Sequence, residues 1–396
     1  MVHAFFIFIF ITMKKIFLLL TFLLCTHVAW ANKVVEVEGI NYCIDVYDKI
    51  AYVTGGKNYT GSVVILSSIE VNGITYPVTS LGPYCFKNCA TLTSINIPNS
   101  VTWFLDNCFE GCTGLSSITI PNSVKGLGQN CFLNCTALST VTIPNSVTYF
   151  GQSCFDGCTN LTSIIIPNSV QSLGSGCFRY CTSLTSVTIP NSVTNVGSWC
   201  FAGCTGLTNI DIPNSVTNLG QNCFQGCTSL TSVTIPNSVT NVESWCFDGC
   251  TALASITIPN SVTSLGYYCF QNCKSLTYIN LPNSVTSLEF MCFNDCSGLA
   301  SIIIPNSVTS VATWCFNGGT YPIYCYESLY AQLKSEYGKR VILIDTPSGI
   351  EEIATDNNSP TINSYYDLTG RRLNGKQCGV NIVRHSDGTT RKIMVK

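Results

Sequence analysis

The tripeptide Pro-Asn-Ser, followed by valine, occurs ten times in this chain, always 23 residues after the previous copy. The copies begin at residues 98, 121, 144, 167, 190, 213, 236, 259, 282 and 305. A fixed period of 20 to 29 residues, with leucines and branched residues in register, is typical of solenoids built from stacked short repeats. The sequence therefore predicts an elongated repeat protein whose function depends on a surface rather than on a pocket.

One repeat is enough to predict the course of a turn. Val233 and Ile235 occupy alternate positions, as in a short strand with one buried face. Pro236 ends this strand because proline cannot donate a ladder hydrogen bond. The two cysteines of residues 246–250 lie four apart, as on one face of a short helical turn. The predicted fold is a leucine-rich repeat superhelix of 23-residue turns, mostly β, with short parallel strands, short helical turns, small terminal caps and a small C-terminal β-domain.

Stacked turns place equivalent residues about 4.7 to 5 Å apart, so each position becomes a column along the solenoid. No single turn can bury its own leucine and phenylalanine, and only stacking closes the core. The predicted leucine column contains Leu92, Leu115, Leu138, Leu161, Leu184, Leu207, Leu230, Leu253, Leu276 and Leu299. The predicted phenylalanine column contains Phe86, Phe109, Phe132, Phe155, Phe178, Phe201, Phe224, Phe247, Phe270, Phe293 and Phe316. The asparagines of the tripeptide are expected to form a polar column that bonds the turn backbone, with a ligand role as the alternative.

Cysteine is unusually frequent, with 25 residues in the chain. Ten Cys-x-x-x-Cys pairs and Cys315 fall on two further columns. Disulfides are permitted in a secreted protein. In-register cysteines of adjacent turns point the same way, however, and this geometry disfavours bridging. We expect free buried thiols that pack as small apolar groups, with a few disulfides or a zinc site as the alternatives. No metal site or cofactor is assigned.

Charge and histidine content argue against two classes of function. Only 10% of the residues are charged, and residues 92–320 carry eight acids against three bases, which leaves no basic surface for nucleic acid. Of the three histidines, His3 and His27 lie near the N-terminus and His385 near the C-terminus. The repeats therefore lack a histidine to act as general base for a serine or cysteine nucleophile, and no phosphate-binding glycine loop or HExxH motif is present. The sequence predicts that the protein is not an enzyme.

The repeat also carries a family resemblance. The string Ile-Pro-Asn-Ser-Val-Thr, followed by Cys-Phe-x-x-Cys-Thr-x-Leu, resembles the BspA-type leucine-rich repeat, also found in the Treponema leucine-rich proteins, over residues 78–319. Cysteine stands where that family usually has a small residue, often alanine, before the phenylalanine. The resemblance implies a secreted or surface-attached protein, because several bacterial members act as adhesins toward host extracellular matrix or other microbes. The expected partner is an extracellular protein or glycan, and a structural spacer or surface-layer component without a ligand is the alternative.

The N-terminus reads as a secretory signal peptide over residues 1–31, with Met13 as the true start. Two lysines follow Met13, residues 16–24 are apolar, and small residues flank Trp30. The mature chain would begin at Asn32. A membrane anchor is the competing interpretation, but the two lysines divide the region into apolar runs that are too short to span a bilayer. No transmembrane span is expected in the mature chain.

The remaining segments flank the repeats. Residues 32–77 are expected to form the N-terminal cap and residues 320–346 the C-terminal cap, because a solenoid must cover its open apolar ends. A polar linker follows over residues 347–360. Residues 361–396 resemble the C-terminal sorting domain recognised by the type IX secretion system of Bacteroidota, with a Tyr-Asp-x-x-Gly-Arg motif that begins at Tyr366. That resemblance implies contact with the export machinery and a location outside the cell or on its outer surface; a small β-domain without an export role is the alternative.

The candidate ligand surface lies where aromatic residues accumulate just before the first cysteine of each pair. Aromatic residues are enriched at contact hot spots, since they bury a large area with few rotatable bonds. Packing between neighbouring turns is the alternative role for these rings. The strand face, rich in serine and threonine, could also meet a flat glycan or protein. The candidate residues are Trp199, Trp245, Tyr267, Tyr268, Phe290 and Trp314.

Overall fold

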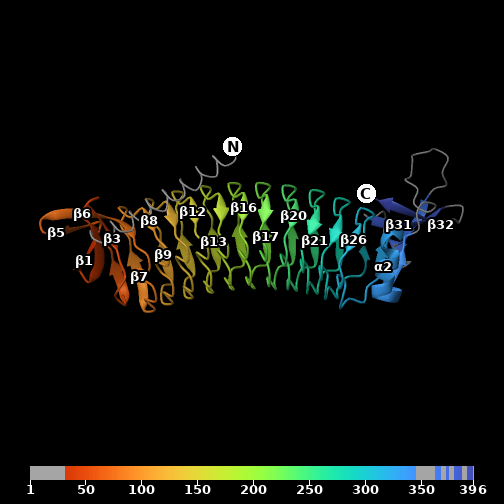
Figure 1. The fold of residues 1–396 in the computed structure, drawn as a ribbon, viewed down its shortest axis with the longest axis horizontal. Helices are drawn as coiled ribbons and strands as arrows, with labels where there is room; N and C mark the ends of the chain where they lie inside the picture. The colour runs from red at the N-terminus through yellow and green to blue at the C-terminus, as the bar shows by residue number, and fades with distance from the viewer. Residues whose placement is uncertain (1–31, 345–361, 367–371, 374–378, 386–389, 396) are drawn as a thin grey trace, which may run out of the picture.

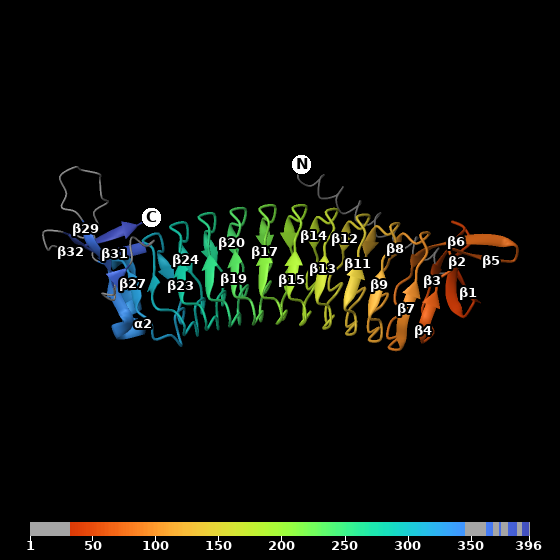
Figure 2. The ribbon, with the colours of Figure 1, turned by 180° about the vertical axis from the view of Figure 1, so that it is seen from behind.

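The computed structural model describes residues 32–344, 362–366, 372–373, 379–385 and 390–395. Within residues 32–344 the chain winds into a long, gently curved solenoid, with the turns side by side along its length (Figures 1 and 2). The predicted signal peptide and the predicted linker lie outside the described residues and remain predictions. The predicted repeat solenoid is confirmed.

The turns build two faces of parallel strands, which we call the first and second faces. Neighbouring turns pair with an offset of 23 residues, as in Val233 opposite Ile256 and Val242 opposite Leu265. On the first face lie β4 (Gly61–Val64), β7 (Leu92–Asn96), β9 (Ser117–Thr119), β11 (Thr140–Thr142), β13 (Ser163–Ile165), β15 (Ser186–Thr188), β17 (Asn209–Asp211), β19 (Ser232–Thr234), β21 (Ser255–Thr257), β23 (Tyr278–Asn280), β25 (Ile302–Ile303), β27 (Ile323–Cys325) and β28 (Val341–Leu343). On the second face lie β3 (Ile50–Val53), β6 (Ile74–Leu81), β8 (Trp103–Phe104), β10 (Gly126–Leu127), β12 (Tyr149–Phe150), β14 (Ser172–Leu173), β16 (Asn195–Val196), β18 (Asn218–Leu219), β20 (Asn241–Val242), β22 (Ser264–Leu265), β24 (Ser287–Leu288) and β26 (Ser310–Val311).

Both predicted apolar columns fill the interior. Every phenylalanine of the column is fully buried, and the leucines are buried with at most 4% exposure. Consecutive phenylalanine rings stack with centroids 5.2 to 6.0 Å apart and planes within 11° of parallel. Offset stacking of this kind adds to the free energy gained by burying the rings. Each turn therefore supplies the apolar surface that its neighbour needs.

The Cys-x-x-x-Cys segments form the third face, and the prediction of a short helical turn is wrong there. The backbone instead makes consecutive hydrogen-bonded turns, for example from the Cys89 amide to the Phe86 carbonyl at 3.1 Å. The residue before each cysteine is left-handed, and such residues cannot continue a helix. The turns are joined by backbone bonds such as the one from the Phe86 amide to the Cys108 carbonyl, at 2.8 Å.

The Pro-Asn-Ser-Val segments form tight turns closed by a bond from the valine amide to the proline carbonyl, as in Val216 to Pro213 at 3.0 Å. The predicted asparagine column is wrong, because all ten asparagines are exposed. Serine supplies the bond between turns instead: the hydroxyl of Ser215 donates to the carbonyl of Val193 at 2.7 Å. Seven other serines, residues 123, 169, 192, 238, 261, 284 and 307, make the equivalent contact. A hydroxyl reaches the neighbouring carbonyl where the exposed amide does not.

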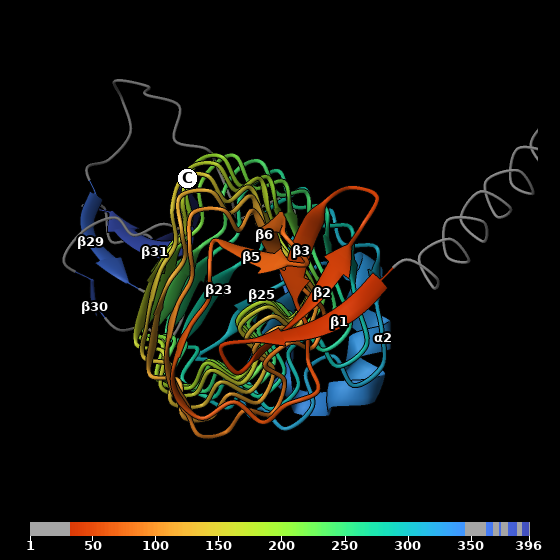
Figure 3. The same ribbon diagram turned by 90° about the vertical axis from the view of Figure 1, so that its left-hand side faces the viewer.

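The N-terminal region lies over the first turns. Strand β1 (Asn32–Val37) pairs antiparallel with β2 (Ile40–Asp45), β2 pairs antiparallel with β3, and β3 then pairs parallel with β6. Strand β5 (Ser68–Val71) forms an antiparallel pair with β6. Figure 3 looks onto this end, where these strands lie in front of the stacked turns. Residues 32–77 are therefore mostly antiparallel, unlike the repeats that follow.

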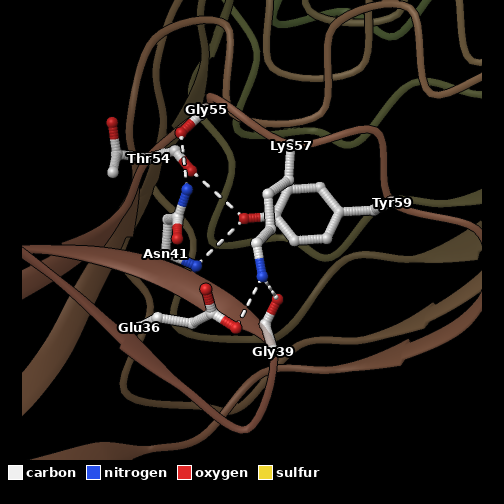
Figure 4. A network of polar contacts seen from close by, with 7 residues as sticks. All are labelled: Glu36, Gly39, Asn41, Thr54, Gly55, Lys57 and Tyr59. Carbon is white, nitrogen blue, oxygen red and sulfur yellow. Dashed lines mark hydrogen bonds and ion pairs between the residues drawn. The ribbon is translucent and has the colours of Figure 1, made fainter.

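A polar network joins the strands of this region (Figure 4). The Tyr59 hydroxyl accepts a bond from the Asn41 amide at 3.0 Å and donates to the Thr54 carbonyl at 3.4 Å. The Lys57 ammonium lies 2.6 Å from the Glu36 carboxylate and bonds the Gly39 carbonyl at 3.2 Å. The loop that carries Lys57 and Tyr59 is thereby fixed to the first hairpin.

At the other end, helix α2 (Glu327–Tyr337) and the 3-10 helix η1 (Gly338–Arg340) lie next to the last turn. The Arg340 guanidinium donates to the carbonyls of Phe316, at 2.9 Å, and Gly319. The Tyr337 hydroxyl accepts the Phe316 amide at 3.3 Å. These side chains satisfy backbone groups that a further turn would otherwise pair, which is what a closing cap must do.

The described parts of the C-terminal tail form a small antiparallel sheet, as expected. It contains β29 (Ile362–Tyr366), β30 (Arg372–Leu373), β31 (Gly379–His385) and β32 (Thr390–Val395), in the order β30-β29-β31-β32. Within it, Asn381 of β31 pairs with Ile393 of β32. The export role of the tail remains a prediction.

Candidate binding surface

The residue before the first cysteine of each pair forms a column of mixed exposure, which we call the pre-cysteine column. Its eleven members are Tyr84, Asn107, Asn130, Ser153, Gly176, Trp199, Asn222, Trp245, Tyr268, Met291 and Trp314. All eleven have φ between 51° and 63°. This left-handed conformation is readily adopted by glycine and tolerated by asparagine, but it is unfavourable for bulky side chains. Five tryptophan, tyrosine or methionine residues therefore occupy unfavourable positions in the second half of the column.

Four of the predicted binding residues form a continuous chain of ring contacts. The rings of Trp245 and Tyr268 stack with centroids 4.9 Å apart and planes 7° from parallel. Tyr268 then meets the edge of Phe290 at 5.4 Å, and Phe290 lies 5.6 Å from Trp314. These contacts between turns contribute to packing, which was the alternative role for the rings.

The other two predicted residues lie apart from that chain of contacts. Trp199 is two turns before Trp245, with Asn222 between them in the column, and Tyr267 precedes Tyr268 in sequence. Trp199 is 39% exposed, and Tyr267 and Trp314 are each 50% exposed. The structure therefore brings four of the six candidates together, and three of the six present large exposed ring surfaces.

Acidic groups accompany this aromatic region. Glu243 and Glu289 precede column residues by two positions and are half-buried, and Glu289 accepts a bond from the Ser287 hydroxyl at 3.1 Å. Burial raises the pKa of Asp248 above its ordinary value, although hydrogen bonds from Gln225 and Asn272 act in the opposite direction. A ligand for this region would therefore meet aromatic rings beside carboxylates.

Two exposed rings on the second face are not among the residues predicted from the sequence. Trp103 and Tyr149 are 43% and 46% exposed, and both pair in register with Gly126, which lies between them. The available signal was the outward position that each occupies in its two-residue strand. On the first face, Ile165 and Tyr278 are exposed apolar groups among serine and threonine.

The cysteine columns are buried and chemically protected. All 23 described cysteines are free thiols in buried positions. Burial raises the pKa of the Cys246 thiol to about 12, and the thiol of Cys200 also has a pKa well above its ordinary value because it is buried. Since the thiolate is the reactive form, these groups are poor nucleophiles.

The second cysteine of each pair has a structural role as hydrogen-bond donor. Nine of these thiols donate to the phenylalanine carbonyl of the preceding turn at 3.0 to 3.2 Å, at residues 112, 135, 158, 181, 204, 227, 250, 273 and 296. Gly319 replaces the cysteine of the last pair, and there the Tyr321 hydroxyl donates to the Phe293 carbonyl at 3.4 Å. A Cβ at Gly319 would lie 2.2 Å from the Tyr321 ring. Glycine therefore makes room for the ring that supplies the missing donor.

Two features are absent from the residues that the structure describes. Within them, no cluster of three or more histidine, cysteine, aspartate or glutamate side chains is arranged to hold a metal ion. The helices in that part of the chain are too short or too polar to cross a bilayer. Neither result identifies a function.

Solved bacterial proteins share this architecture. A leucine-rich cell surface protein from Faecalibacterium prausnitzii is 30% identical, with a TM-score of 0.57, over 75% of this chain and 90% of its own. A leucine-rich repeat protein from Bacteroides ovatus is 24% identical, with a TM-score of 0.55, over 78% of this chain and 100% of its own. A search of curated protein sequences gave no match. The first similarity extends to sequence and fold, and the second supports the fold.

A family model assigns the repeats directly. The BspA type leucine rich repeat region matches residues 79–208 and 200–321, in close agreement with the 78–319 expected from the sequence. These matches cover more than half of the chain. Their limits coincide with the stacked turns between the N-terminal sheet and helix α2. The protein therefore belongs to the BspA-type leucine-rich repeat family.

Proposed function

We propose that this protein is exported to the cell surface or beyond and binds an extracellular macromolecule, a protein or a glycan, through the aromatic half of its pre-cysteine column. A surface or adhesive role is consistent with the repeat family and with the description of the Faecalibacterium relative as a cell surface protein. The signal peptide and the sorting-like tail would provide the export route. Contact with that export machinery is part of the proposal.

One observation carries the proposed binding surface. Bulky rings occupy backbone positions where glycine or asparagine would be more stable, at Trp199, Trp245, Tyr268 and Trp314. A bulky residue in this conformation costs roughly 1 to 2 kcal/mol. Strained backbone conformations are found mostly at functional sites, where the interaction made by the strained residue offsets the conformational cost. Ligand contact would explain why the rings are placed there.

The proposed function is non-catalytic. The thiols are buried, and residues 32–344 contain no histidine. The rings of the pre-cysteine column offer contact area, and the repeated motif itself is used to build the interior.

The test is a binding screen with the full secreted chain. Fibronectin, laminin, collagen and mucin glycans are immobilised, and binding is compared between the wild type and Trp199→Ala, Trp245→Ala, Tyr268→Ala and Trp314→Ala. We expect at least one partner to bind and the variants to weaken its binding about tenfold, as truncated hot-spot residues do. Tyr47→Ala is the matched control, because that ring is 80% exposed in a distant N-terminal turn.

A structural spacer or surface-layer component is the second candidate. The ring contacts from Trp245 to Trp314 favour it, because packing between turns would be enough to explain them. A wild-type protein that binds nothing across the panel would support the spacer. If binding is unchanged in all four variants, the ligand-binding site must lie on another face.

A further inference from the structure

Trp103 and Tyr149 are exposed aromatic residues of the second face, in strands β8 and β12, and neither belongs to the pre-cysteine column. Strands β8, β10 and β12 are adjacent and parallel, so the two residues lie two turns apart, or about 10 Å along the solenoid. The Trp103 ring lies over Gly126, where an added Cβ would come within 2.3 Å of Cζ3. Any residue larger than glycine at position 126 would therefore displace the ring. The later members of the same column are serine or asparagine, so the pair is confined to these turns.

An unpaired cation lies beside the pair. Lys125 immediately precedes Gly126 and is exposed. The ion pairs among the described residues involve Lys57, Lys87 and Arg179, and none involves Lys125. Lys125 is therefore an exposed cation next to Gly126 in sequence, with no ion-pair partner among the described residues.

Hydroxyls complete the edge of this surface. Thr102 and Thr148 flank Lys125 in the neighbouring turns, and their hydroxyls donate to the carbonyls of Thr79 at 3.1 Å and Lys125 at 3.2 Å. With its hydrogen committed in this way, each Oγ keeps a lone pair that can accept from a ligand hydroxyl. The surface therefore offers two apolar rings, one positive charge and hydrogen-bond acceptors within three turns.

We propose that Trp103, Lys125 and Tyr149 bind a linear, unsulfated polysaccharide that carries a carboxylate on alternate sugars. A pyranose ring has an apolar C–H face that packs on an aromatic ring, and its hydroxyl edge suits threonine oxygens and a lysine. The backbone positions of Trp103 and Tyr149 lie two turns apart, and the Trp103 ring lies over Gly126 in the turn between them. A polymer lying along the solenoid would therefore cross both rings, and the single lysine of the middle turn matches one carboxylate. Densely sulfated polymers need clusters of basic residues. Residues 92–320 have eight acids and only three bases, which makes the surface unsuitable for them.

The test uses the full chain and hyaluronan oligosaccharides, an unsulfated polymer with alternating uronate, in a titration followed by calorimetry. Heparin, carboxyl-reduced hyaluronan and a neutral glucan are the comparison ligands. Wild type should prefer hyaluronan to all three. Trp103→Ala and Tyr149→Ala should each weaken hyaluronan binding by about tenfold, as expected for loss of an aromatic contact.

Lys125→Gln isolates the charge. It should weaken hyaluronan binding about threefold to tenfold and leave carboxyl-reduced hyaluronan unaffected, because a charge contact at the edge of a site is modest and specific to the carboxylate. Lys274→Gln, which removes another exposed lysine of the repeats, is the matched control. Trp103→Tyr keeps a ring over Gly126, so partial retention of binding there separates ligand contact from misfolding.

Three results would overturn the proposal: no wild-type binding to hyaluronan at low salt, equal binding to heparin or the neutral glucan, or full binding by Trp103→Ala and Lys125→Gln. The site is independent of the pre-cysteine column. Trp245→Ala should leave hyaluronan binding unchanged, so failure of the proposed function and failure of this site give different results.

Discussion

The two halves of the repeat array have the same interior but differ at the pre-cysteine column. Between Tyr84 and Trp199 the column holds Asn107, Asn130, Ser153 and Gly176, small residues that suit or tolerate the left-handed backbone. From Trp199 onward, asparagine occurs only at position 222, and the rest are bulky. The phenylalanine column is continuous through both halves. The backbone of the repeat therefore requires one conformation everywhere, and the second half departs from the residues that fit it best.

This difference distinguishes the positions that folding requires from those to which we assign a function. Positions that pack inward repeat with little variation because every turn must bury its neighbour's apolar surface. The pre-cysteine column varies in residue type and in exposure, and its bulky members are the ones that its left-handed backbone disfavours. We interpret the second half as the ligand-binding region and the first half as the same scaffold with a different, smaller aromatic site at Trp103 and Tyr149.

Alkaline pH should produce the largest effect, and the same effect in both halves. Buried thiols keep their protons in the folded state, whereas unfolded thiols ionise near pH 8.5. Above that pH the unfolded state binds fewer protons, so the free energy of unfolding falls by about 1.4 kcal/mol per pH unit for each affected thiol. Denaturant titrations between pH 7 and 10 should show a steep loss of stability. Hydrogen exchange that reports loss of protection in only one half would contradict a shared interior.

Substitutions in the phenylalanine column should cost nearly the same in both halves. Phe132→Ala and Phe270→Ala each remove a fully buried ring that stacks on two neighbours. Each should lower the free energy of unfolding by about 3 to 5 kcal/mol, measured by urea denaturation. Tyr47→Ala serves as the exposed control. A cost below about 1 kcal/mol at either site would show that the column there is not a packed core.

Exchanging residues between the halves should change stability in opposite directions. Asn130→Trp places a bulky side chain on a left-handed backbone and should destabilise the fold by roughly 1 to 2 kcal/mol. Trp199→Asn should stabilise it by up to a similar amount. Thermal unfolding monitored by circular dichroism measures both. If Trp199→Asn proves clearly destabilising, the ring serves packing rather than binding.

The smallest difference concerns the serines of the tight turns. Ser215 donates to the Val193 carbonyl at 2.7 Å, whereas the Ser146 hydroxyl is buried and has no hydrogen-bond partner among the described residues. Ser215→Ala should cost about 1 kcal/mol, and Ser146→Ala should be neutral or slightly stabilising, since it removes an unsatisfied group. Paired urea titrations should resolve the two. Equal costs would remove the inferred role of the hydroxyl bond.

The period, the strands and the interior could be predicted from sequence because they depend on residues that recur at every turn. Leu230, Phe247 and Pro236 have one environment each, repeated along the chain. The prediction of a helical turn in the Cys-x-x-x-Cys segment is wrong because a four-residue spacing also fits a helix. The left-handed residue before each cysteine carries no unique side-chain signal, since Asn130, Gly176 and Trp245 all adopt this backbone conformation.

The candidate surface was less predictable, because exposed contacts depend on how neighbouring turns sit together. Ring stacking of Trp245 on Tyr268 follows from the register, but the exposure of Trp103 depends on Gly126 in the next turn. The tripeptide asparagines gave the wrong expectation for a similar reason. Both serine and asparagine can bond a turn, and only the geometry between turns shows that serine makes the contact.

The most direct test is the binding isotherm of the double variant Trp199→Asn/Trp314→Asn, measured against whichever immobilised partner the wild type binds best. These two exposed rings are replaced by a residue that suits their backbone, so the fold should be kept while at least tenfold of the affinity is lost. An isotherm that overlays the wild type, from a protein of unchanged stability, would contradict a binding role for the aromatic half of the column.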